Sequence, residues 1–144
     1  MELLFALSIR QPWLDMILRG VKSMEVRTWE IRRKGLIALH SPWMIDFGAA
    51  YFYGYEEPWK LPRGRIVGTA EVADVRELDE TSWRESLRLH RQPVPMMSGA
   101  FGITLRDVRI LPKPFPYRGK QMLFPLDEKA SNHVLQNVNL KPRV

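Results

Sequence analysis

The segment from residue 20 to residue 27, GVKSMEVR, brings three charged side chains close together along the chain. Lys22 follows a glycine turn, and Glu25 and Arg27 stand two residues apart. Residues two apart share one face of a strand, so we predict that Glu25 and Arg27 point the same way. A lysine beside carboxylates can bind an anion or polarise a carbonyl, and a desolvated glutamate can accept a proton from water. The segment therefore predicts a recognition or hydrolytic site, with a solvated strand face as the alternative.

A further charged residue, Glu71, lies in the most apolar and β-branched stretch of the chain, residues 66–75. Both faces of this predicted strand are apolar, so we expect Glu71 to be half-buried and to need a cationic partner. Gly68 and the small residues after it leave room for a ligand or for another backbone. A structural salt bridge and a functional site explain Glu71 equally well.

Several other residues could contact a ligand. Arg10 and His40 each end a predicted strand, where they could contact phosphate or a base edge, or else form turn and capping bonds. Trp13 could stack on a base, although its place in an apolar helical stripe favours core packing. The aromatic segment 51–59 could close over a ligand, but packing over the end of the predicted fold, a small β-barrel, is the simpler interpretation. The three histidines show no metal-ligand spacing, so we predict neither a metal nor a cofactor.

The elements that must position these residues are short strands separated by helices. We predict strands over residues 4–9, 24–29, 35–40, 66–75, 101–110 and 122–126, and helices over residues 12–20, 43–52 and 82–90, the second capped by Ser41. A phase slip in the apolar alternation predicts a bulge near Arg106 and Asp107. The prolines between residues 112 and 119 predict a loop. This order indicates an α+β fold, a small mixed β-barrel with two or three peripheral helices.

Size and composition limit the possibilities. A chain of 144 residues suits one domain, which we place at residues 1–126, followed by a polar C-terminal tail at 127–144 with one helical turn. The absence of cysteine excludes disulfides and thiolate chemistry. No export signal and no apolar run of membrane-spanning length is visible, so we expect a cytoplasmic protein without a membrane partner. The net charge of +6 makes nucleic acid a reasonable partner.

Gly20, Lys22, Glu25 and Arg27 together resemble the signature of ASCH domains. Segments 7–13 (LSIRQPW), 105–108 (LRDV) and 116–119 (PYRG) are similar to the opening and closing parts of that family, so the resemblance spans about residues 3–126. It implies a PUA-like barrel whose cleft, between the first helix and the sheet, binds RNA, single-stranded nucleic acid or a modified nucleoside. On this basis we expect the ligand to be contacted by Arg10, Gln11, Trp13, Arg27 and His40.

The resemblance leaves the activity open. One bacterial branch that resembles this chain contains acetylcytidine amidohydrolases, which use a lysine, a threonine three residues later and a glutamate from a later strand. Lys22 and Glu71 match two of these roles, but Glu25 occupies the threonine position and Thr28 points to the other side of the strand.

A water-based mechanism would therefore be needed. In it Lys22 holds a carbonyl or phosphate, Glu25 positions Lys22, and Glu71 is the general base, with Arg27 bracing the carboxylates. The family that this chain resembles also includes ribonucleases and nucleic-acid-binding parts of transcriptional coactivators. A non-catalytic binding module is accordingly the alternative to a hydrolase.

Overall fold

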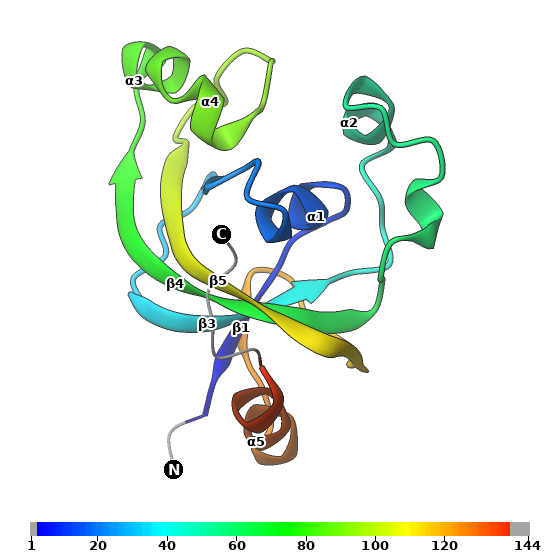
Figure 1. The fold of residues 1–144 in the computed structure, drawn as a ribbon. Coiled ribbons are helices and arrows are strands. Elements are labelled where there is room, and N and C mark those ends of the chain that lie inside the picture. The colour runs from blue at the N-terminus through cyan, green and yellow to red at the C-terminus, as the bar shows by residue number, and fades with distance from the viewer. Residues whose placement is uncertain (1–2, 139–144) are drawn as a thin grey trace.

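The fold is built on one curled six-stranded sheet, described here from a computed structural model for residues 3–138 (Figure 1). The strand order is β2-β5-β4-β3-β1-β6, and every neighbouring pair is antiparallel except β1 and β3. The strands are β1 (Phe5–Ser8), β2 (Met24–Arg27), β3 (Gly35–Ser41), β4 (Arg65–Glu77), β5 (Phe101–Pro116) and β6 (Leu123–Pro125). The predicted α+β class with a mixed, barrel-like sheet is confirmed.

Helices lie inside the curl of the sheet, around its open end and against its outer face (Figure 1). They are α1 (Trp13–Leu18), α2 (Phe47–Phe52), α3 (Glu80–Glu85), α4 (Leu87–His90) and α5 (Glu128–Asn137), with a 3-10 turn η1 (Pro58–Lys60). The described part of the chain thus has more helices than the two or three predicted. The predicted helix over residues 82–90 is split into α3 and α4, and α2 begins after Asp46 rather than after Ser41.

The predicted bulge in β5 is confirmed. Thr69 pairs with Arg109 and Glu71 pairs with Arg106, so β5 contains one residue more than β4 between these two pairs. Asp107 lies at this bulge. Its φ of +49° is in the left-handed region of backbone conformation, which aspartate tolerates better than most residues. The bulge lets the long β4–β5 ribbon bend around the helices that it encloses.

Glu71 is exposed, so the expectation of a half-buried carboxylate is wrong. Its neighbours across the strands are Leu36 and Arg106, which are exposed as well. The apolar cluster beneath α5 includes Ile66 of β4, but it does not extend to Glu71, where this face of the sheet is open to solvent. The room left by Gly68 is taken by another backbone, because a Cβ there would lie 2.2 Å from the Arg109 carbonyl oxygen.

The hydrophobic core has two main parts, one on each face of the sheet. Inside the curl, Leu14 and Ile17 of α1 pack against Leu39, Val72 and other residues of the strands. On the other side, α5 buries Ala130, Ser131 and Val134 against β1, β4 and β6 (Figure 1). Each of the two helices buries its apolar face against the sheet, so the hydrophobic effect holds both helices in place.

Helix α5 corrects the prediction for the C-terminal segment, since it runs from Glu128 to Asn137 instead of forming one helical turn. The Asp127 side chain caps it by accepting a hydrogen bond from the Ala130 backbone. Residues 139–144 of the predicted tail lie outside the described residues. A domain boundary between residues 126 and 127 stays a prediction.

The prediction of a loop between residues 112 and 119 is wrong for the first part of that range, because β5 continues through Pro112 and Pro114 to Pro116. Strand β2 pairs only with Phe101 to Thr104, so the second half of β5 is bonded on one side only. Proline lacks the N–H that a ladder needs, but it is tolerated on such a free edge.

Candidate nucleic-acid interface

The three charged residues of the GVKSMEVR segment form one connected cluster. Lys22 Nζ forms an ion pair with Glu25 Oε1 at 3.3 Å. Arg27 donates two hydrogen bonds to Glu25 Oε2, from Nη2 at 2.6 Å and from Nε at 3.1 Å. Strand β2 brings Glu25 and Arg27 onto one face, as predicted, and the preceding turn directs Lys22 toward them. The sequence therefore identified a real ion-pair cluster.

Lys22 lies inside the protein. Its side chain has no exposed surface, its ammonium donates to the His90 carbonyl at 2.7 Å, and it sits 4.9 Å from the centre of the Trp13 ring. Burial lowers the pKa of Lys22, against the opposing effect of Glu25. Because all these partners are protein groups, the geometry makes Lys22 a support for Glu25 rather than a group that a ligand can reach.

The charge of Glu25 is held by its two cations. Burial alone would raise the pKa of the Glu25 carboxyl, but Arg27 and Lys22 together outweigh burial and keep that pKa below its ordinary value. Both carboxylate oxygens are engaged. Glu25 therefore stays ionised at neutral pH, and it is poorly suited to accept a proton from water.

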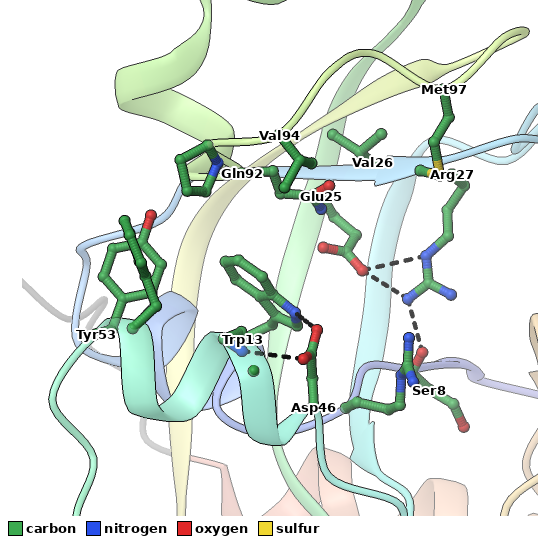
Figure 2. A pocket seen from close by; sticks show the side chains of 15 residues that line it. Ser8, Trp13, Glu25, Val26, Arg27, Asp46, Tyr53, Gln92, Val94 and Met97 are labelled. Carbon is green, nitrogen blue, oxygen red and sulfur yellow. Dashed lines mark hydrogen bonds and ion pairs between the residues drawn. The ribbon is translucent and has the colours of Figure 1, made fainter.

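Next to this cluster lies a cavity of about 590 Å³, which we call the first cavity (Figure 2). Its walls come from the end of β1, from α1, β2 and α2, and from the segment after α4. The lining residues are Ser8, Arg10, Trp13, Glu25, Val26, Arg27, Asp46, Gly48, Ala49, Phe52, Tyr53, Gln92, Pro93, Val94 and Met97. The volume is that of a small-molecule site, and the lining combines apolar walls with a few polar groups, as such sites do.

Trp13 and Asp46 fix one wall of the first cavity. The Trp13 indole nitrogen donates to Asp46 Oδ2 at 3.0 Å, while Asp46 Oδ1 accepts from the Ala49 backbone and so caps α2 (Figure 2). The Trp13 ring also packs edge-on against Tyr53. Trp13 therefore both packs against the core and presents a ring to the cavity, which combines the two roles that its position in the sequence suggested.

Two tyrosines hold the segment after α2 in place. The Tyr53 hydroxyl donates to the Arg91 carbonyl, which joins the α2 side of the cavity to the segment after α4. The Tyr55 hydroxyl donates to Asp15 Oδ2 of α1 at 2.7 Å. The predicted aromatic segment 51–59 thus does contribute to the site, through Phe52 and Tyr53 in the cavity wall.

A second, larger cavity of about 1040 Å³ opens beside the first and shares Ser8, Arg10 and Arg27 with it. We call it the second cavity. Its other walls come from the end of β3, the following residues, and the loop between β5 and β6. These residues are His40, Pro42, Trp43, Met44, Gly64, Pro116, Tyr117, Arg118, Gly119, Lys120, Gln121 and Met122.

The remaining predicted site residues have different positions. Arg10 is exposed and lines both cavities, whereas Gln11 is buried and lines neither. The Gln11 amide instead donates to the Pro62 carbonyl and accepts from the Asp15 backbone. Glu71 also lines neither cavity and has no ion pair or hydrogen bond with Lys22. The structure therefore brings together Lys22, Glu25 and Arg27, but it does not bring Glu71 to them.

His40 anchors the loop between β5 and β6. Its Nε2 lies 2.9 Å from the Tyr117 carbonyl oxygen, so this nitrogen carries a proton and donates it, and Nδ1 lies 3.0 Å from Ser8 Oγ. Burial lowers the pKa of His40. Gly119 packs directly on the ring, since a Cβ there would lie 2.3 Å from a ring carbon. His40 thus fixes the backbone that carries Arg118 and Lys120.

Sequence reasoning missed Ser8, Asp46 and the segment 92–97 as parts of the site, whereas Tyr53 belongs to the aromatic segment that it had singled out. Asp46 could have been found from the sequence as the N-cap of α2, because aspartate is one of the preferred residues at that position. The segment 92–97 is brought to β2 only by tertiary packing, so no local pattern could have indicated it.

No group of three or more histidine, aspartate or glutamate side chains within residues 3–138 is arranged to hold a metal ion. In the same part of the chain, no helix has the length and apolar character needed to cross a membrane.

Comparison with known proteins gives a family and a fold. The model of the ASCH domain family matches residues 7–134. Similar solved structures include the ASCH protein of Zymomonas mobilis, with 15% identity, a TM-score of 0.57, and coverage of 94% of this chain and 95% of that chain.

Two single-substitution variants of the Zymomonas mobilis ASCH protein are also similar. The serine-to-alanine variant has 14% identity and a TM-score of 0.64, with coverage of 94% of this chain and 96% of that chain. The tyrosine-to-phenylalanine variant has 13% identity and a TM-score of 0.63, with coverage of 96% and 100%. Comparison with curated proteins finds no match.

Proposed function

This chain belongs to the ASCH domain family, and from that premise we propose that it binds RNA by holding one nucleoside in the first cavity. The observation that carries the proposal is the first cavity itself. It has the volume of a ligand site, an aromatic ring from Trp13 in one wall, and the Glu25–Arg27 ion pair in the other (Figure 2).

The chemistry of these walls suits a nucleoside. An indole ring offers a face on which any base can stack, a contact typically worth about 1–3 kcal/mol. Arg27 contributes N–H donors for the acceptors of a base or sugar, and Glu25 and Asp46 contribute acceptors for exocyclic amines and hydroxyls. The fixed positions of Trp13, Asp46 and Glu25 in the free protein reduce the entropy that binding would cost.

The geometry favours binding over hydrolysis. The carboxylates in the first cavity are Glu25 and Asp46, and both oxygens of each already accept a hydrogen bond or an ion pair. Lys22 is enclosed and Glu71 lies on the open face of the sheet. The mechanism in which Lys22 polarises a carbonyl while Glu71 activates water therefore has no geometric support. We propose a recognition module, in which Lys22 positions Glu25.

Filling the first cavity tests the proposal. Ala49 lines the cavity from α2, so Ala49→Leu adds bulk there without touching the ion pairs. We expect this variant to bind a fluorescein-labelled, mixed-sequence RNA octamer at least about tenfold more weakly by anisotropy, because it excludes one stacked base. Ala73→Leu is the matched control, since Ala73 is also half-buried and lines neither cavity.

Equal affinity of wild type and Ala49→Leu would reject the proposal. Hydrolysis is tested with the same proteins, by looking for acetate release from N4-acetylcytidine and for cleavage of the octamer. A recognition module leaves both probes intact. Turnover that Ala49→Leu abolishes would replace the binding module with an enzyme at the same cavity.

A further inference from the structure

The charge of the second cavity differs from that of the first. The described residues that line the second cavity include four cationic side chains, Arg10, Arg27, Arg118 and Lys120, and no acidic one. The first cavity instead balances Arg10 and Arg27 with two carboxylates. One cavity is therefore suited to a neutral group and the other to an anion.

The two cavities are neighbours, because Ser8, Arg10 and Arg27 contribute to the walls of both. Arg27 is held there by two hydrogen bonds to Glu25 and by a third from Nη2 to the Ser8 carbonyl at 2.7 Å (Figure 2). A molecule that extends out of the first cavity thus passes two guanidinium groups before it reaches the second.

The basic loop of the second cavity has a fixed backbone. Ser8 Oγ donates to the Lys120 carbonyl at 2.8 Å, His40 donates to the Tyr117 carbonyl, and the Tyr117 backbone donates to the Gly64 carbonyl at 3.0 Å. The side chains of Arg118 and Lys120 remain exposed. Their charges are thus presented from a preorganised support, while the side chains themselves are open to an incoming phosphate.

An exposed aromatic ring stands at the rim of the second cavity. Trp43 is 68% exposed, which is unusual for a side chain of this size. It is nevertheless held in place, since Arg63 lies 5.0 Å from the ring centre and donates to the Trp43 carbonyl. Gly64 packs against the ring, because a Cβ there would lie 2.7 Å from the indole nitrogen. A supported, exposed indole beside cations is the usual stacking platform of single-strand binders.

We infer that the second cavity is a subsite for the sugar–phosphate backbone of single-stranded RNA, adjacent to the nucleoside in the first cavity. Arg118 and Lys120 contact phosphates, Arg10 marks the junction, and Trp43 stacks on a neighbouring base. The inference rests on the proposed function and extends it, because it assigns the backbone of the bound RNA to the residues of the second cavity.

Salt dependence tests this subsite. For single strands, each phosphate contact contributes about 0.7 to the slope of log affinity against log salt, so Arg118→Gln with Lys120→Gln should reduce that slope by about 1.4 for the RNA octamer. The double variant Arg76→Gln with Lys129→Gln is the matched control. It removes the same charge from exposed residues that line neither cavity, and its slope should stay near that of wild type.

The outcomes separate the two proposals. An unchanged slope in the Arg118→Gln, Lys120→Gln protein would overturn the backbone subsite, whereas loss of octamer binding in Ala49→Leu would still support the nucleoside site. A slope that falls equally in the control variant would also overturn the subsite, because the effect would then come from net charge alone. Trp43→Ala should weaken octamer binding severalfold without changing the slope, and wild-type affinity in that variant would remove Trp43 from the subsite.

Discussion

Lys22 and Glu25 form an ion pair in the interior of the protein, with Nζ 3.3 Å from Oε1 and no exposed surface on the lysine side chain. The pair connects the interior of the protein with the wall of the cavities. On its inner side the ammonium is satisfied by the His90 carbonyl and the Trp13 ring, and on its outer side the carboxylate holds Arg27 at the junction of the two cavities. Lys22 therefore acts on the ligand only through Glu25.

Removing the lysine charge should destabilise the protein. Lys22→Met keeps most of the side-chain volume but leaves Glu25 in the interior with one cation instead of two. Breaking a buried pair typically costs about 3–5 kcal/mol, and we expect the lower end of this range because Arg27 remains. Urea denaturation measures the loss. The exposed control Lys129→Met should change the free energy of unfolding by less than about 0.5 kcal/mol.

The double variant Lys22→Met with Glu25→Met distinguishes a charge effect from a packing effect. Without the carboxylate, the buried charge that lacks its partner is gone, so the double variant should be more stable than the sum of the two single changes predicts. Strict additivity would show that the pair does not interact as the structure describes.

Asp46 should be important for both stability and binding. Asp46→Ala removes the cap of α2 and the acceptor of the Trp13 indole, and we expect it to cost about 1–2 kcal/mol and to weaken nucleoside binding. Asp79→Ala removes a comparable cap from α3, which lines neither cavity. It should lower the melting temperature similarly and leave RNA affinity unchanged. Loss of affinity in both variants would indicate a general effect of instability.

Stability should fall as the pH falls below neutrality. Burial, with help from Lys22, lowers the pKa of His90, whose Nδ1 accepts from the Gln92 backbone while Nε2 donates to the Trp83 carbonyl. The pKa of buried His40 is lowered as well. Below a pH of about 6.5 the histidines of the unfolded chain bind protons, while those of the folded chain stay neutral. The free energy of unfolding therefore decreases as the pH falls, until the lower pKa values of the folded protein are reached.

Urea denaturation at pH 7.5 and at pH 5.5 tests this sign. The free energy of unfolding should be smaller at pH 5.5, and His90→Gln should reduce the difference between the two values. Equal or greater stability of the wild type at pH 5.5 would mean that these histidines are not buried in the neutral form.

Gly119 offers a way to disturb the second cavity alone. Gly119→Ala places a methyl group against the His40 ring and should displace the loop that carries Arg118 and Lys120. We expect weaker binding of the RNA octamer and unchanged binding of single nucleosides, measured by anisotropy and by calorimetry. A parallel loss for nucleosides would show that the change has spread to the first cavity.

Much of the fold followed from local patterns. Alternation along the strands predicted that Glu25 and Arg27 share a face, and the phase slip located the bulge at Asp107, because both depend only on the two-residue period of a strand. The expected contact between Lys22 and Glu25 is also present, although it was proposed from the chemistry of the site and not from a strand pattern.

The errors arose where tertiary cover decides the outcome. Glu71 was expected to be half-buried because its strand is apolar on both sides, yet the cover from α5 ends before it. Gln11 was expected to bind a ligand, but packing turns its amide toward Pro62 and Asp15. The second cavity is assembled from segments that are distant in sequence, so no local pattern could define it.

The central claim is that a nucleoside of RNA occupies the first cavity, and the indole N–H of Trp13 reports on it directly. The chain has five tryptophans, so its ¹⁵N-labelled indole signals can be assigned by single replacement with phenylalanine. Saturating RNA octamer should shift the signal of Trp13 and leave that of half-buried Trp29, which lines neither cavity, unchanged. An unchanged Trp13 signal in the presence of bound RNA would contradict the account.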